Sequence, residues 1–73
     1  MPTLPEAHLR NLLAQAGRDL TEAEQRRERQ ARIVSDLLDG TGTHAAAQKV
    51  LREINRTIAF SRANHELIEH ILA

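Results

Sequence analysis

The residues most able to bind a metal or take part in a reaction lie near the C-terminus, in the segment HELIEH at positions 65–70. On a helix His65 lies one turn from Glu69, and Glu66 lies one turn from His70; imidazole and carboxylate groups are common metal ligands. The two histidines are five apart and point to different faces, whereas zinc proteases need two histidines four apart. The Glu-x-x-His spacing of di-iron bundles is also absent. We therefore expect no metal ligand and no cofactor in this segment.

His65 itself is interpreted as a polar residue of a helix seam, beside Ala16 or a group of a partner chain. Histidine titrates in the range of about pH 5 to 7. This interpretation predicts a dimer dissociation constant that depends on pH in the wild type but not in His65→Leu. Equal pH dependence in the two proteins would contradict it.

A second group of residues able to bind a ligand is a basic cluster that contains Arg26, Arg29 and Arg32. Arginine binds phosphate with directional hydrogen bonds, so these three residues are the candidates for a nucleic-acid contact. Acidic residues are interleaved with them, and the pairs Glu22–Arg26 and Glu28–Arg32 have the one-turn spacing typical of a solvated surface. With ten basic and ten acidic residues the net charge is zero, so nucleic acid is not the expected partner.

Catalysis is not expected. The chain has no cysteine, and neither Ser35 nor Ser61 has a neighbouring histidine and carboxylate in the sequence. Phe60 is the one aromatic residue, which argues against an aromatic-lined pocket for a small-molecule substrate. We expect a protein that is not an enzyme.

The helix-breaking residues predict two helices. Prolines occur only at positions 2 and 5, and glycines only at 17, 40 and 42. A helix is predicted over about residues 4–39, capped by Thr3 with Glu6 in a capping box. A glycine and threonine turn at 40–43 follows, and a second helix runs over about 44–72. Gly17 leaves an alternative open, in which a new helix begins after it at Asp19 or Thr21.

Apolar residues recur at alternating steps of three and four, which is typical of a coiled-coil seam. The first seam is Leu13, Ala16, Leu20, Ala23, Arg27, Gln30, Val34 and Leu37; the second is Ala47, Leu51, Ile54, Ile58, Ser61, His65, Ile68 and Leu72. Folding at the turn pairs Val34 with Ala47 and Leu13 with Ile68, so one register serves both helices. The polar seam residues Arg27 and Gln30 are expected to set that register or to reach along the edge of the interface. The sequence predicts an all-α, antiparallel two-helix hairpin that forms one domain.

Further apolar residues, Ile33 and Val50 among them, lie outside these seams and need a second surface. Those expected at an interface are Leu12, Phe60, Ala63, Leu67 and Ile71. A chain of 73 residues buries little core by itself, so we expect a homodimer in the form of a four-helix bundle. The alternative is a hydrophobic groove for a different protein.

Residues 26–34, the Gly40 turn and residues 45–51 resemble short proteobacterial helical-hairpin proteins of no known function. Those proteins have an Arg/Gln-rich first helix, a Gly-x-x-Thr turn and a His or Asn near the end of the second helix. Gly40 to Thr43 matches that turn, and Asn64-His65 the later position. Family members often carry His-Asp where this chain has Thr41-Gly42. The resemblance implies the hairpin fold and no function.

The expected location is the cytoplasm, because the N-terminus lacks the pattern of a signal peptide and no apolar stretch is long enough for a membrane span. The expected function is that of a non-enzymatic, self-associating protein interaction module, with regulation of another protein as one use. The alternative is a nucleic-acid accessory protein that uses Arg26, Arg29 and Arg32. Solution mass and salt-dependent binding would separate the two.

Overall fold

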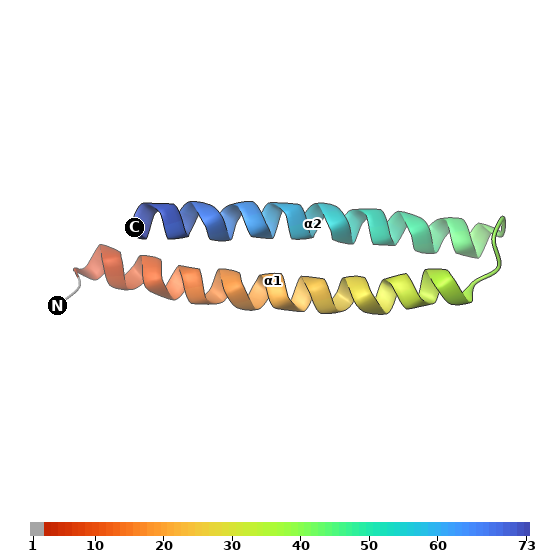
Figure 1. Cartoon of the computed structure of the whole chain (residues 1–73), viewed down its shortest axis with the longest axis horizontal. Helices are drawn as coiled ribbons and strands as arrows, with labels where there is room; N and C mark the ends of the chain where they lie inside the picture. Colours follow the sequence, from red (N-terminus) through yellow and green to blue (C-terminus); the bar gives the residue numbers. More distant parts are fainter. Residues whose placement is uncertain (1–2) are drawn as a thin grey trace.

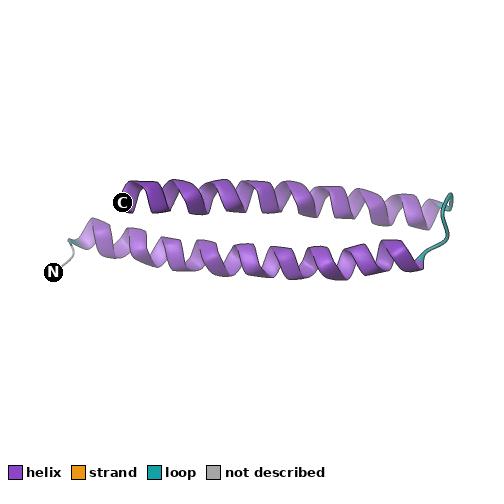
Figure 2. Ribbon diagram, in the orientation of Figure 1, coloured by secondary structure: helices purple, strands orange, loops and turns teal. Residues whose placement is uncertain are grey.

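The computed structural model describes residues 3–73 and consists of two long helices that pack side by side in opposite directions (Figure 1). Helix α1 spans Leu4–Asp36 and helix α2 spans Gly42–Leu72. The described part of the chain contains no strand, and the ribbon is helical apart from the connection and the ends (Figure 2). The molecule measures 57 × 14 × 14 Å, so it is a rod two helices wide.

Helix α1 begins where the sequence predicts. The Thr3 hydroxyl accepts a hydrogen bond from the Glu6 backbone N–H at 3.2 Å, which satisfies one of the free donors of the first turn. Pro5 lies within that turn, where its missing N–H costs no helical hydrogen bond.

The helix is continuous through Gly17, so the alternative of a new helix after this residue is wrong. Thr21 does not cap a helix; its hydroxyl donates to the Gly17 carbonyl at 3.0 Å within the same helix. The imidazole of His65 on α2 lies beside Gly17, and a methyl group added there would be 3.8 Å from Nε2. Packing against α2 therefore supports a helical turn that glycine alone would weaken.

The connection begins earlier than the sequence predicts. Helix α1 ends at Asp36 rather than at about Asp39, because Leu37 takes an extended conformation. Its N–H still bonds the Val34 carbonyl at 3.3 Å. Gly40 has a φ of 81°, which is the left-handed conformation that glycine adopts without strain. The predicted turn at residues 40–43 is therefore shifted toward the N-terminus.

Helix α2 begins at Gly42, two residues before the predicted start, because Thr41 is the cap. The Thr41 hydroxyl accepts from the His44 N–H at 3.0 Å and donates to the Leu38 carbonyl at 2.9 Å. One side chain thus closes the first turn of α2 and holds the connection against it.

The core is the seam between the two helices. Its most buried hydrophobic residues are Ala16, Ala23, Ala47, Ile58 and Ile68. The small alanines let the helix backbones approach, and in the predicted register the larger Ile58 lies opposite Ala23. Gln30 donates from its amide to the Ala47 carbonyl at 2.9 Å, across the seam. This hydrogen bond and the contact of Gly17 with His65 have the register that the sequence predicts.

Arg27 holds a seam position in the sequence, and its side chain is exposed. This fits the second of the two expected arrangements, in which the long side chain reaches along the edge of the interface. Gln30, by contrast, is half-buried and bonded to the facing helix.

Within residues 3–73, neither helix combines the length and the apolar character needed to cross a lipid bilayer.

Candidate functional site

The seam divides the hairpin into two faces, and a single ion pair identifies one of them. Arg62 Nη2 lies 3.7 Å from Glu24 Oε1, between α2 and α1. Each of these residues directly follows a seam residue, Ser61 and Ala23 respectively. Because the helices are antiparallel, residues that follow seam positions on both helices share this face. Residues that come directly before a seam residue, such as Leu13, Leu20, Leu51 or Leu72, must then lie on the other face.

That other face carries most of the exposed hydrophobic side chains. Six of the eight large ones exposed in the described chain lie on it or at its outer edge on α2. We call this surface the apolar face: Leu12, Ile33, Val50, Phe60, Leu67 and Ile71. The remaining two are Leu4, in the first turn of α1, and Leu38, in the connection.

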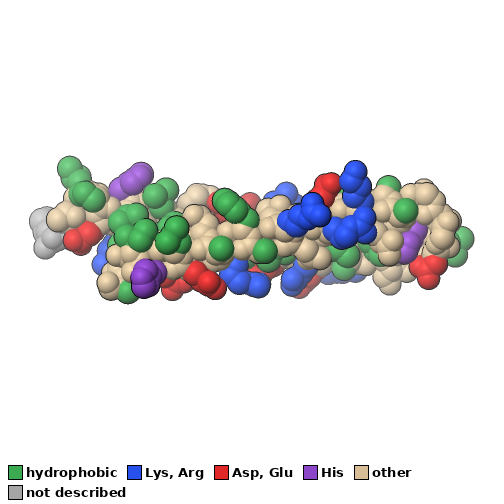
Figure 3. Space-filling model, turned by 90° about the horizontal axis from the view of Figure 1, so that it is seen from above, with side chains coloured by type: hydrophobic (Ala, Val, Ile, Leu, Met, Phe, Trp, Pro, Cys, Tyr) green, Lys and Arg blue, Asp and Glu red, His purple; other side chains and the backbone are tan. Residues whose placement is uncertain are grey.

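Within the apolar face, exposure is greatest in the second half of α2. Phe60 is 75% exposed, Leu67 58% and Ile71 54%. Viewed from above, hydrophobic side chains gather toward the end of the rod that holds both chain termini (Figure 3). Single exposed apolar residues are common on proteins, but a contiguous group typically marks an interaction surface.

The structure thus places four of the five expected interface residues, Leu12, Phe60, Leu67 and Ile71, on one face. The fifth, Ala63, is exposed on the outer side of α2, next to Asn64 and at the border of the face. Ile33 and Val50, which the sequence marked only as apolar residues outside the seams, extend the face toward the connection.

The centre of the apolar face is polar. Asp19 and Arg26 occupy it on α1, and Thr57 and Asn64 on α2, each at a seven-residue step from the apolar residues at the two ends. All four are exposed. In the described part of the chain neither Asp19 nor Arg26 takes part in an ion pair; Asp19 Oδ1 accepts a hydrogen bond from the Gln15 amide at 2.8 Å.

His65 lies in the seam of its own hairpin. Its side chain is 28% exposed, its Nδ1 is 2.7 Å from Glu69 Oε1, and its Nε2 would lie 3.8 Å from a methyl group added at Gly17 on α1. The ring therefore faces α1 at the level of Gly17, next to the expected neighbour Ala16. The proposed pH dependence of assembly stays a prediction.

The acidic and histidine residues of the C-terminal segment do not converge. Across residues 3–73, no group of three or more His, Asp or Glu side chains is arranged to hold a metal ion. His65 and Glu69 form a pair one turn apart, and Glu66 and His70 point away from them as exposed residues.

The arginine cluster is exposed along α1, as a contact with phosphate would require. However, the pairs Glu22–Arg26 and Glu28–Arg32 are not formed within the described chain, and the one ion pair of this region joins Glu24 to Arg62 on α2. Sequence reasoning missed a further basic group on the outer side of α2. Its residues Lys49, Arg52 and Arg56, together with Glu53, line a surface hollow.

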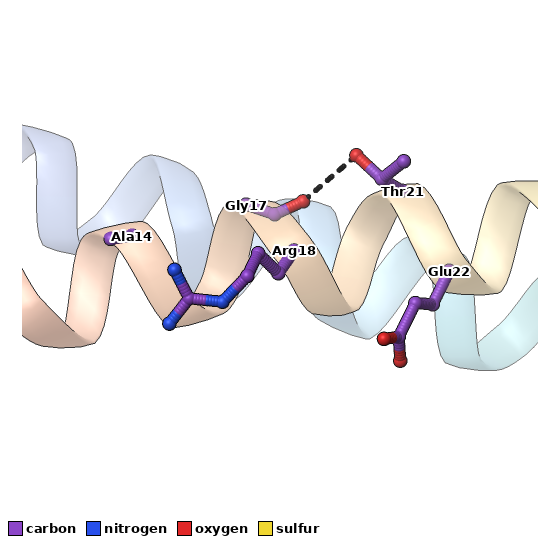
Figure 4. Close-up of a pocket in the computed structure, with 5 residues that line it drawn as sticks. All are labelled: Ala14, Gly17, Arg18, Thr21 and Glu22. Carbon is purple, nitrogen blue, oxygen red and sulfur yellow. Dashed lines mark hydrogen bonds between the residues drawn. The ribbon is translucent and has the colours of Figure 1, made fainter.

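The larger surface hollow, of about 420 Å³, is lined by residues of α1 alone (Figure 4). They are Ala14, Gly17, Arg18, Thr21 and Glu22. In the close-up, the Arg18 and Glu22 side chains extend along the helix surface, and the one hydrogen bond drawn joins Thr21 to Gly17. The hollow results from small residues on one helix surface, and it brings no side chains of the two helices together.

Sequence reasoning also missed the role of His44. This residue is 8% exposed, and its Nε2 lies 3.1 Å from Asp39 Oδ1 in the connection. The available signal was its place three residues after Thr41, where the first turn of a capped helix folds back toward the preceding loop. His44 and Asp39 thus fasten the connection to α2.

No family model, no curated protein and no solved structure matches this chain. The surfaces of the hairpin itself are therefore the guide to its function.

Proposed function

We propose that this protein is a non-enzymatic interaction module whose first partner is a second copy of itself, with two hairpins forming a four-helix bundle through their apolar faces. The observation that carries the proposal is the exposure of Phe60, Leu67 and Ile71 along one face of α2. Covering hydrophobic side chains in such an arrangement with a second surface removes them from water and lowers the free energy.

The exposed area of the hairpin supports a partner as large as a second hairpin. The hairpin exposes 5600 Å² at 8.2 kDa, whereas a compact protein of that mass exposes about 4,500 Å². Two separate hairpins would expose twice this area, about 11,200 Å², against about 7,500 Å² for a compact protein of the combined mass. The difference, about 3,700 Å², lies within the range of about 2,000–5,000 Å² buried in obligate homodimers.

Symmetry also favours a second copy. A two-fold axis presents the same surface on both molecules, so a single apolar face covers itself. The bundle leaves the opposite face, with its Glu24–Arg62 ion pair, exposed to water and to any further protein partner. A regulatory role would use that remaining surface.

The experiment is a light-scattering measurement of mass over a dilution series, with helicity followed by circular dichroism on the same samples. We expect a dimer of about twice 8.2 kDa that dissociates on dilution. Phe60→Ser combined with Leu67→Ser should remove it, whereas the matched pair Asn55→Ser and Glu66→Ser, on exposed positions of α2 away from the apolar face, should retain it. A wild-type protein that is folded and monomeric at all concentrations would contradict self-association.

The second candidate function is a nucleic-acid accessory role. The observation that favours it is the exposure of Arg26, Arg29 and Arg32 on α1 together with the basic residues around Glu53 on α2. Such binding would weaken steeply with salt. Retardation of DNA or RNA that persists at about 0.15 M salt and disappears in Arg29→Gln with Arg32→Gln would support it. Absence of retardation at micromolar protein would eliminate it.

A further inference from the structure

The apolar face has an internal order that distinguishes its two ends from its centre. On α1 it repeats every seven residues through Leu12, Asp19, Arg26 and Ile33, and on α2 through Val50, Thr57, Asn64 and Ile71. Each of these residues comes directly before a seam residue, so all eight lie on the face opposite the Glu24–Arg62 ion pair.

Antiparallel packing arranges the eight residues in four levels along the rod. The cross-helix contacts of Gly17 with His65 and of Gln30 with Ala47 set the alignment. At the end with the termini, Leu12 lies level with Ile71, and at the end with the connection, Ile33 lies level with Val50. The two central levels pair Asp19 with Asn64 and Arg26 with Thr57. The order along the face is thus aliphatic, acidic, basic and aliphatic.

Two copies can stack these faces about a two-fold axis in two ways. If the axis runs along the rod, each level meets the same level of the other copy and α1 faces α2, so Asp19 faces Asn64 and Arg26 faces Thr57, while like charges lie across the diagonal of the bundle. If the axis is perpendicular to the rod, the first level meets the fourth and the second meets the third. Aliphatic residues then still meet aliphatic residues, but Asp19 of each copy meets Arg26 of the other. Like charges repel and opposite charges attract, so the charged levels decide between the two arrangements.

We propose that the hairpins pack head to tail about an axis perpendicular to the rod, with two reciprocal ion pairs between Asp19 of one copy and Arg26 of the other. This inference rests on the proposed self-association and specifies its orientation and register. Leu12 packs on Ile33 of the second copy, and Ile71 on Val50. The rods overlap over their full length of 57 Å, as the large buried area requires.

The residues near the proposed axis fit the same arrangement. Phe60 lies midway between the levels of Thr57 and Asn64, so it meets Phe60 of the second copy, and aromatic pairs of this kind are favourable. However, Glu22 also lies near the axis on α1, so this arrangement brings the two glutamates toward each other, a repulsion that the two Asp19–Arg26 pairs must outweigh.

The charges on the two faces of the hairpin are used differently. On the opposite face Glu24 and Arg62 pair within one chain. On the apolar face Asp19 and Arg26 are exposed and, in residues 3–73, form no ion pair. Seven residues separate them on α1, about two turns, so they are too far apart to pair with each other. A second copy in the head-to-tail orientation brings each a partner.

The first test is a charge-reversal series measured by sedimentation equilibrium. Asp19→Arg and Arg26→Asp should each weaken the dimer by at least about tenfold, because two attractive pairs become repulsive, and the double reversal should restore it. Glu28→Arg, an exposed reversal of the same sign on the other side of α1, is the control for Asp19→Arg and should have little effect. A dimer equally stable in Asp19→Arg and Glu28→Arg would overturn the head-to-tail arrangement.

The second test reads the orientation directly. The chain has no cysteine, so Leu12→Cys and Ile33→Cys each provide a single thiol. A bismaleimide that spans about 10 Å, the distance between packed helix axes, should cross-link the two variants when they are mixed but neither variant alone. In the head-to-tail dimer two copies of position 12 are about 30 Å apart, because 21 residues at 1.5 Å each separate positions 12 and 33.

The two tests separate failure of the orientation from failure of self-association. Efficient cross-linking of Leu12→Cys alone, in a protein that is still dimeric, would overturn the orientation and leave the proposed function intact. A wild-type protein that sediments as a monomer at all concentrations would overturn both.

Discussion

The seam between α1 and α2 and the apolar face beside it contain the same kinds of residue, but water reaches them very differently. Ile58 and Ile68 are 3% and 8% exposed, whereas Phe60 and Leu67 on the same helix are 75% and 58% exposed. Each residue turns a helix by about 100°, so one or two positions suffice to move a side chain from the seam to the next face. One facing helix covers one such stripe. Helix α2 therefore has two apolar stripes, and α1 covers one of them.

The largest effect that tests this comparison is expected from Ile58→Ala. Its side chain is 3% exposed, so truncation leaves a cavity in the seam and should lower the free energy of unfolding by about 3 kcal/mol. Phe60→Ala removes a larger side chain but should lower the stability of the dilute monomer by less than about 1 kcal/mol, because that side chain remains in water. Urea unfolding at several protein concentrations measures both. Equal losses in the dilute monomer would contradict the distinction between seam and face.

A somewhat smaller effect is expected when the seam is overfilled. Ala23 is 1% exposed, and Ala23→Leu forces a large side chain into the closest approach of the helices, which should cost about 2 kcal/mol. Ala63→Leu, the same change at an exposed position of α2, serves as the control and should leave monomer stability nearly unchanged. Thermal unfolding followed by circular dichroism compares them, and a stabilised Ala23→Leu would show that the seam is loosely packed.

At the edge of the seam, Gly17→Ala should stabilise the hairpin by about 0.5–1 kcal/mol. Alanine restricts the unfolded chain and favours the helix, and its methyl group would lie at an ordinary contact distance, 3.8 Å, from His65 Nε2. The matched variant Gly40→Ala should instead destabilise, because Gly40 has a φ of 81°. The midpoint of urea unfolding reports both, and a destabilised Gly17→Ala would mean that the helices need the closer approach of a glycine.

The smallest effect is expected on the face opposite the apolar one. Glu24→Gln removes an ion pair of 3.7 Å between partly exposed side chains, which should cost about 0.5 kcal/mol or less. The difference from the wild type should disappear at high salt, because screening weakens the pair in the unmodified protein. Chemical unfolding at low and high ionic strength measures this. A loss that persists in high salt would indicate a role for Glu24 other than ion pairing.

Much of the fold was predictable because its cause is local. Alternating steps of three and four in apolar residues define the stripe of each helix, and the glycines near residue 40 mark the turn between the two helices. The seam residues Ala16, Ala23, Ala47, Ile58 and Ile68 are indeed the most buried hydrophobic ones. Arg27 is exposed, which fits the expectation that its long side chain can reach along the edge of the interface.

Details of the connection were not predictable in the same way. Thr41 and Thr43 are both suitable caps, and their intrinsic preferences differ too little to choose between them. The choice follows from contacts made after folding: the Thr41 hydroxyl bonds both His44 and Leu38, and His44 reaches Asp39. The candidate site was also predictable only in part. Four of its residues were expected at an interface, whereas Ile33 and Val50 belong to it because of where they lie in the hairpin.

The sequence by itself determined which residues share a stripe on each helix, because the angle between successive side chains of a helix is constant. Only the tertiary structure decided how the stripes of the two helices combine into faces. Opposite chain directions place Glu24 beside Arg62 on one face, and leave the aliphatic residues and the charges of Asp19 and Arg26 together on the other. The physical reason is that the relation between two helices depends on their direction and register, which are set by packing over the whole length of the seam rather than by any local segment.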